Sequence, residues 1–151
     1  MILEPDISLI DIRARSKKQV FEDISRDIAH ELDYDIDSVD LFNKLMKREH
    51  IGSTAIGGGV AIPHIRMPDL DHPMGVFVRL KTAIDFDAPD GQQVDMIYLL
   101  MAPAGSKGSS LMQLSRISNF FRNEEFCEKL RHCTDPFGSI HECNEQQKAA
   151  A

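Results

Sequence analysis

His64 occupies the most tightly specified backbone position among the six histidines of the chain. It follows a glycine-rich turn, a short apolar run and Pro63, whose ring fixes its own φ and biases Ile62 toward extended geometry. An imidazole with a pKa near neutral keeps one nitrogen unprotonated, so it can attack a phosphoryl group and later release it to a second nucleophile. Flexible glycines nearby let backbone amides approach an anion. These residues predict a phosphoryl acceptor at the end of a strand.

Arg48 is the best-placed partner for such a group, because it stands sixteen positions before His64, across one turn. A guanidinium can neutralise phosphoryl oxygens through two parallel hydrogen bonds. From residue types alone, a histidine that only ends a strand is the alternative interpretation. Gly57 to Gly59 match neither the P-loop nor the dinucleotide fingerprint, each of which requires a helix directly afterwards. Nucleotide binding is therefore not predicted.

Two amphipathic helices are predicted ahead of this region. Ser16 and Gln19 have the spacing of a capping box, and apolar residues recur every three to four positions after them. Asp37 or Ser38 can cap a second helix that runs to about Glu49, before Gly52 breaks it. Arg48 is therefore expected in the last turn of that helix.

Strands are predicted in the middle of the chain. The segment from Gly52 to His64 has the composition of a turn followed by a strand. The runs 74–80 and 94–101 are rich in apolar residues and bounded by Pro, Gly and Asp, as buried strands are.

Three helices are predicted after the strands. The first carries Leu111 and Leu114 at helical spacing, Asn123 can cap the second, and Thr134 or Asp135 can cap the third. The polar tail from about Asn144 is expected to be disordered.

The order of these elements predicts an α/β fold. Helices on both sides are needed to bury both faces of the sheet. We expect a three-layer α/β/α sandwich with a small mixed sheet flanked by helices, forming a single domain over residues 1–151.

Composition limits the function further. A formal net charge of −7 repels nucleic acid, so no nucleic-acid partner is expected. The amino terminus lacks the basic region of a signal peptide, and no stretch holds ~18 uninterrupted apolar residues. The protein is expected to be cytoplasmic, without membrane insertion. The basic residues other than Arg48 are interpreted as solvated helix faces: Arg13, Arg15, Lys17 and Lys18, and later Lys44 and Lys47.

The cysteines do not indicate a metal site or a disulfide framework. Cys127, Cys133 and Cys143 are odd in number, and with His132 and His141 they match no common zinc spacing. Reduced thiols that help helices to pack are expected, and no metal.

The run from Arg48 to His64, REHIGSTAIGGGVAIPH, resembles the signature of type-2 IIA domains of the phosphoenolpyruvate-dependent phosphotransferase system. Similar correspondence extends over nearly the whole chain, from about Ile7 to Ile140. It is carried by residues 76–80, 84–88, 90–91, 94–95 and 99–103. The resemblance implies the same sandwich fold.

The resemblance also implies roles for individual residues. His64 is the expected phosphoacceptor, through Nε2, and Arg48 is expected to stabilise the phosphoryl group. An HPr-like phosphocarrier is the expected donor, with neither metal nor organic cofactor. Five further residues of the motif are expected to support the site: Ser53, Thr54, Gly58, Gly59 and Pro63.

One position departs from the family pattern. Family members commonly carry a second histidine before the Leu-x-x-Leu of the third helix, where this chain has Ser110. A serine can donate a hydrogen bond to a phosphoryl oxygen, but it brings no positive charge.

Three functions follow from the resemblance. A stand-alone chain of this length is most similar to the nitrogen-regulatory branch, whose phosphorylation state reports to regulatory target proteins. A free-standing fructose or mannitol IIA component that passes phosphate to a IIB domain is the second interpretation. The third is a protein-interaction module that is not phosphorylated.

Overall fold

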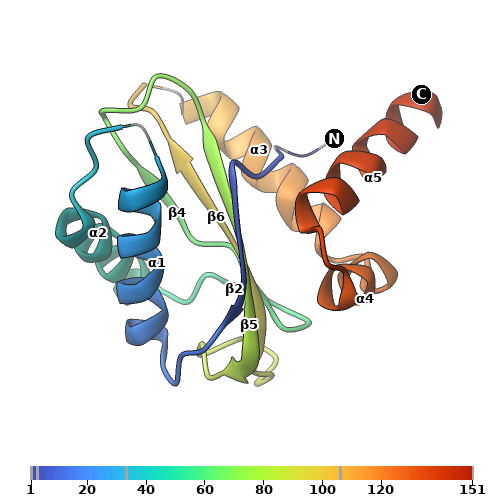
Figure 1. Ribbon diagram of the computed structural model, residues 1–151, viewed down its shortest axis with the longest axis horizontal. Coiled ribbons are helices and arrows are strands. Elements are labelled where there is room, and N and C mark those ends of the chain that lie inside the picture. The colour runs from blue at the N-terminus through green and yellow to red at the C-terminus, as the bar shows by residue number, and fades with distance from the viewer. Residues whose placement is uncertain (1, 3, 33, 106, 151) are drawn as a thin grey trace.

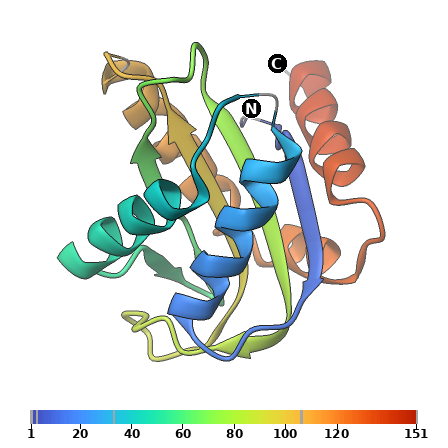
Figure 2. The ribbon, with the colours of Figure 1, turned by 60° about the vertical axis from the view of Figure 1, so that its left-hand side comes forward.

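A mixed β-sheet separates two groups of helices in the computed structural model, which describes residues 2, 4–32, 34–105 and 107–150 (Figure 1). The strands are β1 (Ile7–Ile12), β2 (Ala55–Gly57), β3 (Val60–Ala61), β4 (His64–Arg66), β5 (Met74–Ile84) and β6 (Val94–Ala102). The helices are α1 (Lys17–Glu31), α2 (Ser38–Ile51), α3 (Lys107–Phe120), α4 (Glu124–His132) and α5 (Pro136–Ala150). Helices α1 and α2 cover one face of the sheet, and α3 to α5 lie on the other side (Figure 2).

Strand β6 is the centre of the sheet. The strand order is β1-β5-β6-β3-β2, and β4 also pairs with β6. Pairing is antiparallel for β5 with β6 and for β2 with β3, and it is parallel for β1 with β5 and for β3 and β4 with β6. The sheet is therefore mixed, as the sequence predicts.

Alternate residues of the central strands enter two separate cores. Val76 and Val78 of β5 belong to the core beneath α1 and α2, whereas Phe77 between them belongs to the core beneath α3 to α5. Leu99 and Tyr98 of β6 divide in the same way. Since successive strand residues point to opposite faces, both faces must be covered by helices. The predicted three-layer α/β/α sandwich is confirmed.

The predicted helix caps are confirmed by hydrogen bonds. The Ser16 hydroxyl accepts from the Gln19 N–H at 3.1 Å, and the Asp37 carboxylate accepts from the Val39 N–H at 2.8 Å. Asn123 caps α4 by accepting from Phe126 at 3.1 Å. Helix α2 continues to Ile51, so it is two residues longer than predicted.

Two features of the fold escaped the sequence patterns. The edge strand β1 was not predicted, because apolar and polar residues do not alternate strictly in its sequence ISLIDI, where Leu9 and Ile10 are adjacent. The predicted disorder from about Asn144 is corrected, since α5 continues to Ala150. Asn144 is 3% exposed, and its amide group binds the Ile2 N–H at 3.1 Å and the Ile2 carbonyl at 3.0 Å. These two hydrogen bonds to Ile2 satisfy the Asn144 amide, so this polar residue can be buried within α5.

Gly75 is required where β5 meets the Tyr98 side chain. A Cβ atom at Gly75 would lie 2.2 Å from the Tyr98 Oη atom, and Tyr98 is fully buried. We expect Gly75→Ala to lower the free energy of unfolding by about 1–3 kcal/mol through overpacking, as measured by urea denaturation. Gly108→Ala is the control, because nothing lies within 4 Å of a Cβ there, and it should leave stability equal or higher. Equal stability of the Gly75 variant and the native protein would contradict this account.

Candidate functional site

His64 begins strand β4, next to Leu100 of β6, instead of ending a strand as the sequence predicts. Pro63 before it is buried and accepts a hydrogen bond from the Leu100 N–H at 2.9 Å. The half-buried ring of His64 lies with Nδ1 3.1 Å from the Ile62 carbonyl oxygen. A carbonyl oxygen only accepts, so Nδ1 carries the proton of the neutral ring and Nε2 keeps a lone pair.

The protonation of His64 is set by opposing influences. Burial of the ring is the largest and lowers the pKa of His64 below its ordinary value, and the nearby charge of Arg48 lowers it further. The hydrogen bond to the Ile62 carbonyl and the charge of Glu49 raise the pKa but do not reverse the shift. At neutral pH the ring is therefore mainly unprotonated at Nε2, as a nucleophile must be.

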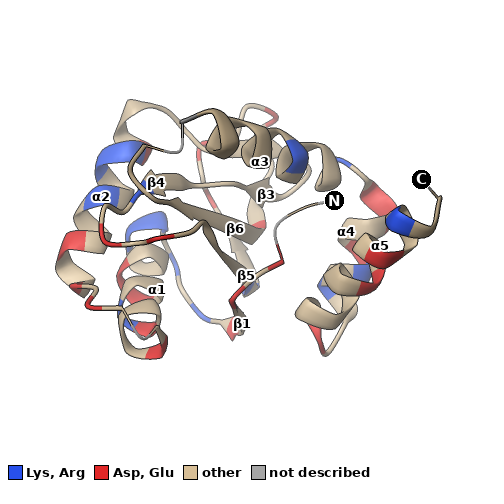
Figure 3. Cartoon of the chain, turned by 90° about the horizontal axis from the view of Figure 1, so that it is seen from above, with Lys and Arg blue, Asp and Glu red and all other residues tan. Residues whose placement is uncertain are grey.

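A pocket of about 540 Å³ opens beside the ring of His64. Among the described residues that line it, four are cationic: Lys44, Lys47 and Arg48 of α2 and Arg66 of β4. Blue segments mark the basic residues in the second half of α2, which lies beside β4, in Figure 3. Cations around a half-buried imidazole give the site the chemistry of an anion receptor.

The structure brings two of the predicted residues into this pocket with His64. Arg48 lies in the last turn of α2, as predicted, and its Nη1 atom donates to the Gly52 carbonyl at 3.1 Å. Ser110 of α3 lines the pocket from the other layer. An arginine and a hydroxyl therefore share the pocket with the histidine.

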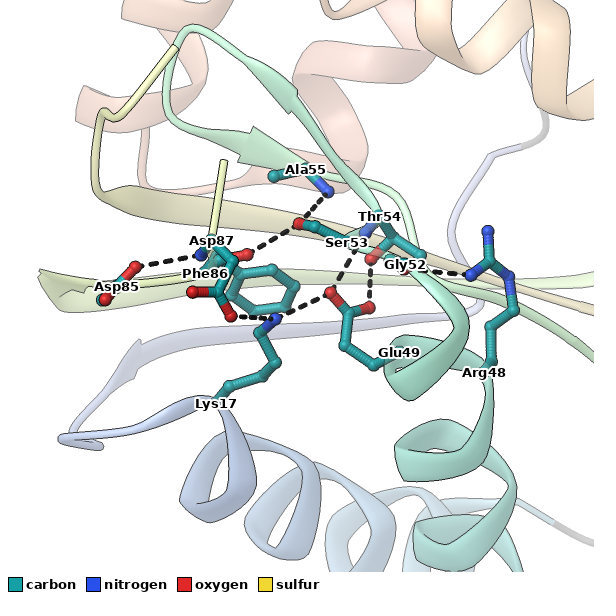
Figure 4. A network of polar contacts seen from close by, with 10 residues as sticks. All are labelled: Lys17, Arg48, Glu49, Gly52, Ser53, Thr54, Ala55, Asp85, Phe86 and Asp87. Carbon is teal, nitrogen blue, oxygen red and sulfur yellow. Dashed lines mark hydrogen bonds and ion pairs between the residues drawn. The ribbon is translucent and has the colours of Figure 1, made fainter. Parts of the chain in front are cut away.

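Ser53 and Thr54 stand behind the site, in a network of polar contacts (Figure 4). The Ser53 hydroxyl donates to the Phe86 carbonyl at 2.6 Å and accepts from the Ala55 N–H at 3.1 Å. Thr54 is buried and binds Glu49 through both its N–H and its hydroxyl. These two residues fix the backbone of the turn and do not line the pocket.

Gly58 and Gly59 are not brought together with His64. They form the turn between β2 and β3, where Gly57, Gly58 and Gly59 all have positive φ. The Gly58 N–H donates to the Asp90 carboxylate at 2.9 Å, and the Gly58 carbonyl accepts from Arg131 at 2.7 Å. The expected approach of glycine amides to an anion is therefore not found at Gly58, because its N–H already has a partner. Conformational freedom explains this triplet.

Glu49 is a residue of this region that the sequence interpretation missed. Its carboxylate is buried, and it receives hydrogen bonds from Thr54 and from the Lys17 ammonium at 2.9 Å. A signal was present, since Glu49 follows Leu41 and Leu45 at four-residue spacing on the buried stripe of α2. A charged residue at an apolar position of a helix indicates a buried polar partner.

Residues 2–150, apart from positions 3, 33 and 106, contain no cluster of three or more His, Cys, Asp or Glu that could hold a metal ion. Over the same described positions, no helix has the length and apolar character needed to cross a membrane. Cys127 is buried in the core beneath α3 to α5, and Cys133 and Cys143 pack against it, in the helix-packing role expected of them.

Comparison with known proteins gives the family. Residues 1–139 match the family model described as phosphoenolpyruvate-dependent sugar phosphotransferase system, EIIA 2. The chain belongs to this EIIA 2 family. The resemblance noted in the sequence is therefore confirmed.

Relatives within the EIIA 2 family cover most of this chain. A nitrogen regulatory protein of Bradyrhizobium diazoefficiens is 37% identical over 134 residues, which is 89% of this chain and 86% of that protein. A nitrogen regulatory protein of Pseudomonas aeruginosa is 35% identical over 130 residues, with 86% and 84% covered. The crystal structure of nitrogen regulatory protein IIA-Ntr from Neisseria meningitidis is similar at a TM-score of 0.77 and 34% identity, covering 86% of this chain and 87% of that chain.

The ionisation of His64 gives a direct test of the pocket. Arg48→Ala removes a positive charge that disfavours the imidazolium form, so the pKa of His64 should rise. The measurement is the pH dependence of the His64 ring resonances by NMR. Arg122→Ala, at an exposed arginine outside this pocket, is the control and should leave the pKa of His64 unchanged. A pKa that stays the same in the Arg48 variant would show that the two side chains do not interact.

Proposed function

We propose that this chain is a phosphoryl carrier of the nitrogen-regulatory type, acting in the cytoplasm as one IIA domain. It accepts phosphate on His64 from an HPr-like phosphocarrier and signals its phosphorylation state to target proteins. The observation that carries the proposal is the hydrogen bond from Nδ1 to the Ile62 carbonyl, which leaves Nε2 as the basic nitrogen beside a cationic pocket.

The transfer conserves atoms and electrons. The lone pair of Nε2 forms a bond to phosphorus, while the bond between phosphorus and the donor nitrogen breaks and its electron pair stays on the donor. The proton of Nδ1 remains in place, so the phosphorylated ring carries a positive charge that the Ile62 carbonyl stabilises. Release to a later acceptor is the reverse of this step.

The pocket supplies charge for the phosphoryl oxygens. Arg48 can bind two of these oxygens in parallel, and the guanidinium is already restrained by the Gly52 carbonyl. Lys47 and Arg66 add long-range attraction, whereas the ammonium of Lys44 is paired with the Asp40 carboxylate at 2.5 Å. Because phosphoryl transfer depends mainly on positioning and charge stabilisation, no metal or organic cofactor is needed in this proposal.

The rim of the pocket is suited to a brief contact with a donor protein. Ile51 is 78% exposed and Leu111 is 69% exposed, and both line the pocket. Exposed apolar side chains beside cations favour a small interface, with apolar contacts at its centre and charges that speed association. A carrier must leave after each transfer, so a small interface suits this role.

The choice between regulation and sugar transport rests on the relatives. The relatives named above at 34% to 37% identity are nitrogen regulatory proteins, which supports a regulator. The family description also names a sugar phosphotransferase system, so transfer to a IIB domain is the second candidate function. A module that binds partners without phosphorylation is the third.

The carrier function is tested by incubating the protein with phosphoenolpyruvate, enzyme I and an HPr-type carrier, and then measuring intact mass. We expect one acid-labile phosphoryl group on the native protein and none on His64→Ala. Arg48→Ala should be phosphorylated about 100-fold more slowly, because a charged donor to the transferring group is lost. His50→Ala, at an exposed histidine of α2, is the control and should behave as the native protein.

The same assay and a comparison of binding partners together separate the three functions. Rapid loss of the phosphoryl group to an added IIB domain would favour sugar transport. Partners that bind His64→Asp but not His64→Ala, or the reverse, would support the regulator. An unmodified native protein beside a phosphorylated carrier in the same tube would exclude the carrier and favour the interaction module.

Ser110 gives a separate prediction. A hydroxyl that donates to a phosphoryl oxygen contributes the energy of a hydrogen bond to a charged group, so Ser110→Ala should slow phosphorylation about 10-fold. Ser109→Ala is the matched control, because the exposed Ser109 is the preceding residue of α3 and does not line the pocket. The single-turnover rate of phosphorylation is measured for both variants. Equal rates would show that the Ser110 hydroxyl does not contribute to phosphoryl transfer.

A further inference from the structure

Glu49 is a buried carboxylate with an unusually complete set of donors. Its side chain is 3% exposed, and its Oε1 atom accepts from Lys17 at 2.9 Å and from the Thr54 N–H at 3.0 Å. Its Oε2 atom accepts from the Thr54 hydroxyl at 2.7 Å. A buried charge is costly unless it is paired and hydrogen-bonded, and these contacts meet that condition.

Thr54 connects the Glu49 carboxylate to Ile62, two residues before His64 in the sequence. Glu49 holds the N–H and the hydroxyl of Thr54, and the Thr54 carbonyl accepts from the Ile62 N–H at 2.9 Å. The Ile62 carbonyl then accepts from His64 Nδ1 at 3.1 Å. A continuous series of hydrogen bonds therefore leads from Glu49 to the ring.

Lys17 anchors the other end of this series. Its side chain is 16% exposed, and its ammonium lies 4.6 Å from the centre of the Phe86 ring and 3.3 Å from Asp87. The Phe86 carbonyl accepts from Ser53, the neighbour of Thr54 (Figure 4). The turn after α2 is thus held from two directions, by the helix and by the loop between β5 and β6.

We infer that the ion pair of Lys17 and Glu49 is a positioning device for His64. By fixing Thr54 and through it Ile62, the pair holds the Ile62 carbonyl where it keeps the proton on Nδ1 and directs Nε2 to the phosphoryl group. The inference rests on the proposed role of His64, but the effect on the ring exists without any donor. Neither residue touches the phosphoryl group, so both act through the backbone.

The negative charge of Glu49 also favours phosphorylation of His64 electrostatically. Arg48 and Glu49 are neighbours on α2, and Figure 4 shows their side chains pointing to different sides of the helix end. The carboxylate raises the pKa of His64, opposing Arg48. Glu49 therefore stabilises the positive ring that forms when Nε2 carries phosphorus.

The test compares Glu49→Ala and Glu49→Gln with a matched control. Asp95→Ala removes a carboxylate that is held by one cation, Arg131, at 2.8 Å. Asp95 lies on β6, and so does Leu100, which pairs with His64. The two are five residues apart, so Asp95 is about 16 Å along the strand from the neighbour of His64. The first measurement is the ¹⁵N spectrum of the His64 ring, which reports the tautomer without any donor. The second is the single-turnover rate of phosphorylation.

We expect a single Nδ1–H tautomer in the native protein and in Asp95→Ala. Glu49→Ala should show a mixture of tautomers and a rate about 10- to 100-fold lower, because small displacements of a nucleophile have effects of this size. Glu49→Gln keeps the shape and one acceptor, so it should recover part of both readouts. If Glu49→Ala does not fold, Glu49→Gln and Lys17→Met carry the test, and each should shift the tautomers in the same direction.

The two levels of the proposal fail in different ways. A folded Glu49→Ala with the native tautomer and the native rate would overturn the positioning role. If Glu49→Ala does not fold, native tautomers in folded Glu49→Gln and folded Lys17→Met would overturn the positioning role. A native protein that shows the expected tautomers but takes no phosphate would overturn the proposed function and leave the positioning role standing.

Discussion

Strand β6 is buried on both faces along nearly its whole length, and every layer of the molecule meets it. Its backbone groups cannot reach water, so they must pair with neighbouring strands. Strand β5 satisfies one edge, and the short strands β3 and β4 share the other. Since β4 is the last of these and begins at His64, the same pairing that satisfies β6 fixes the backbone of the candidate acceptor. The site is therefore attached to the central strand of the sheet.

The candidate site combines two electrostatic arrangements that differ in burial. In front of His64, four cations line an open pocket, where water screens their repulsion. Behind it, Lys17 is paired with the buried carboxylate of Glu49 and, at its more open side, with the exposed carboxylate of Asp87. The open cations can attract an anion, whereas the enclosed pair can only hold the backbone. A single helix, α2, supplies residues to both, because Arg48 and Glu49 are successive and point in different directions.

Local sequence signals were sufficient to predict the helices, the long strands and their layers. Contacts between residues distant in sequence could not be predicted. The capping spacing at Ser16, the cap at Asp37 and the long apolar strands each reflect interactions within a few residues, and they predicted the sandwich. The pair Ile2 and Asn144 spans nearly the whole chain, so the tail after Asn144 read as polar and disordered. Arg48 was placed beside His64 by motif. The spacing of Glu49 after Leu41 and Leu45 indicated burial, but its partner Lys17, 32 positions away, was interpreted as part of a solvated face, so the pair was missed.

A phosphoryl group at His64 would change one small region of a chain whose net charge is already −7. Charges separated by more than about 8 Å are largely screened at physiological ionic strength, so a partner senses the local pocket and not the total. Unmodified, that pocket presents cations beside the exposed side chains of Ile51 and Leu111. With nearly two negative charges added at its centre, the cations of the pocket would be neutralised by the phosphoryl oxygens beside the same apolar rim. Under the proposed function, one transfer event would therefore give two distinct docking surfaces at the same place, because His64 is held in β4 by its pairing with β6.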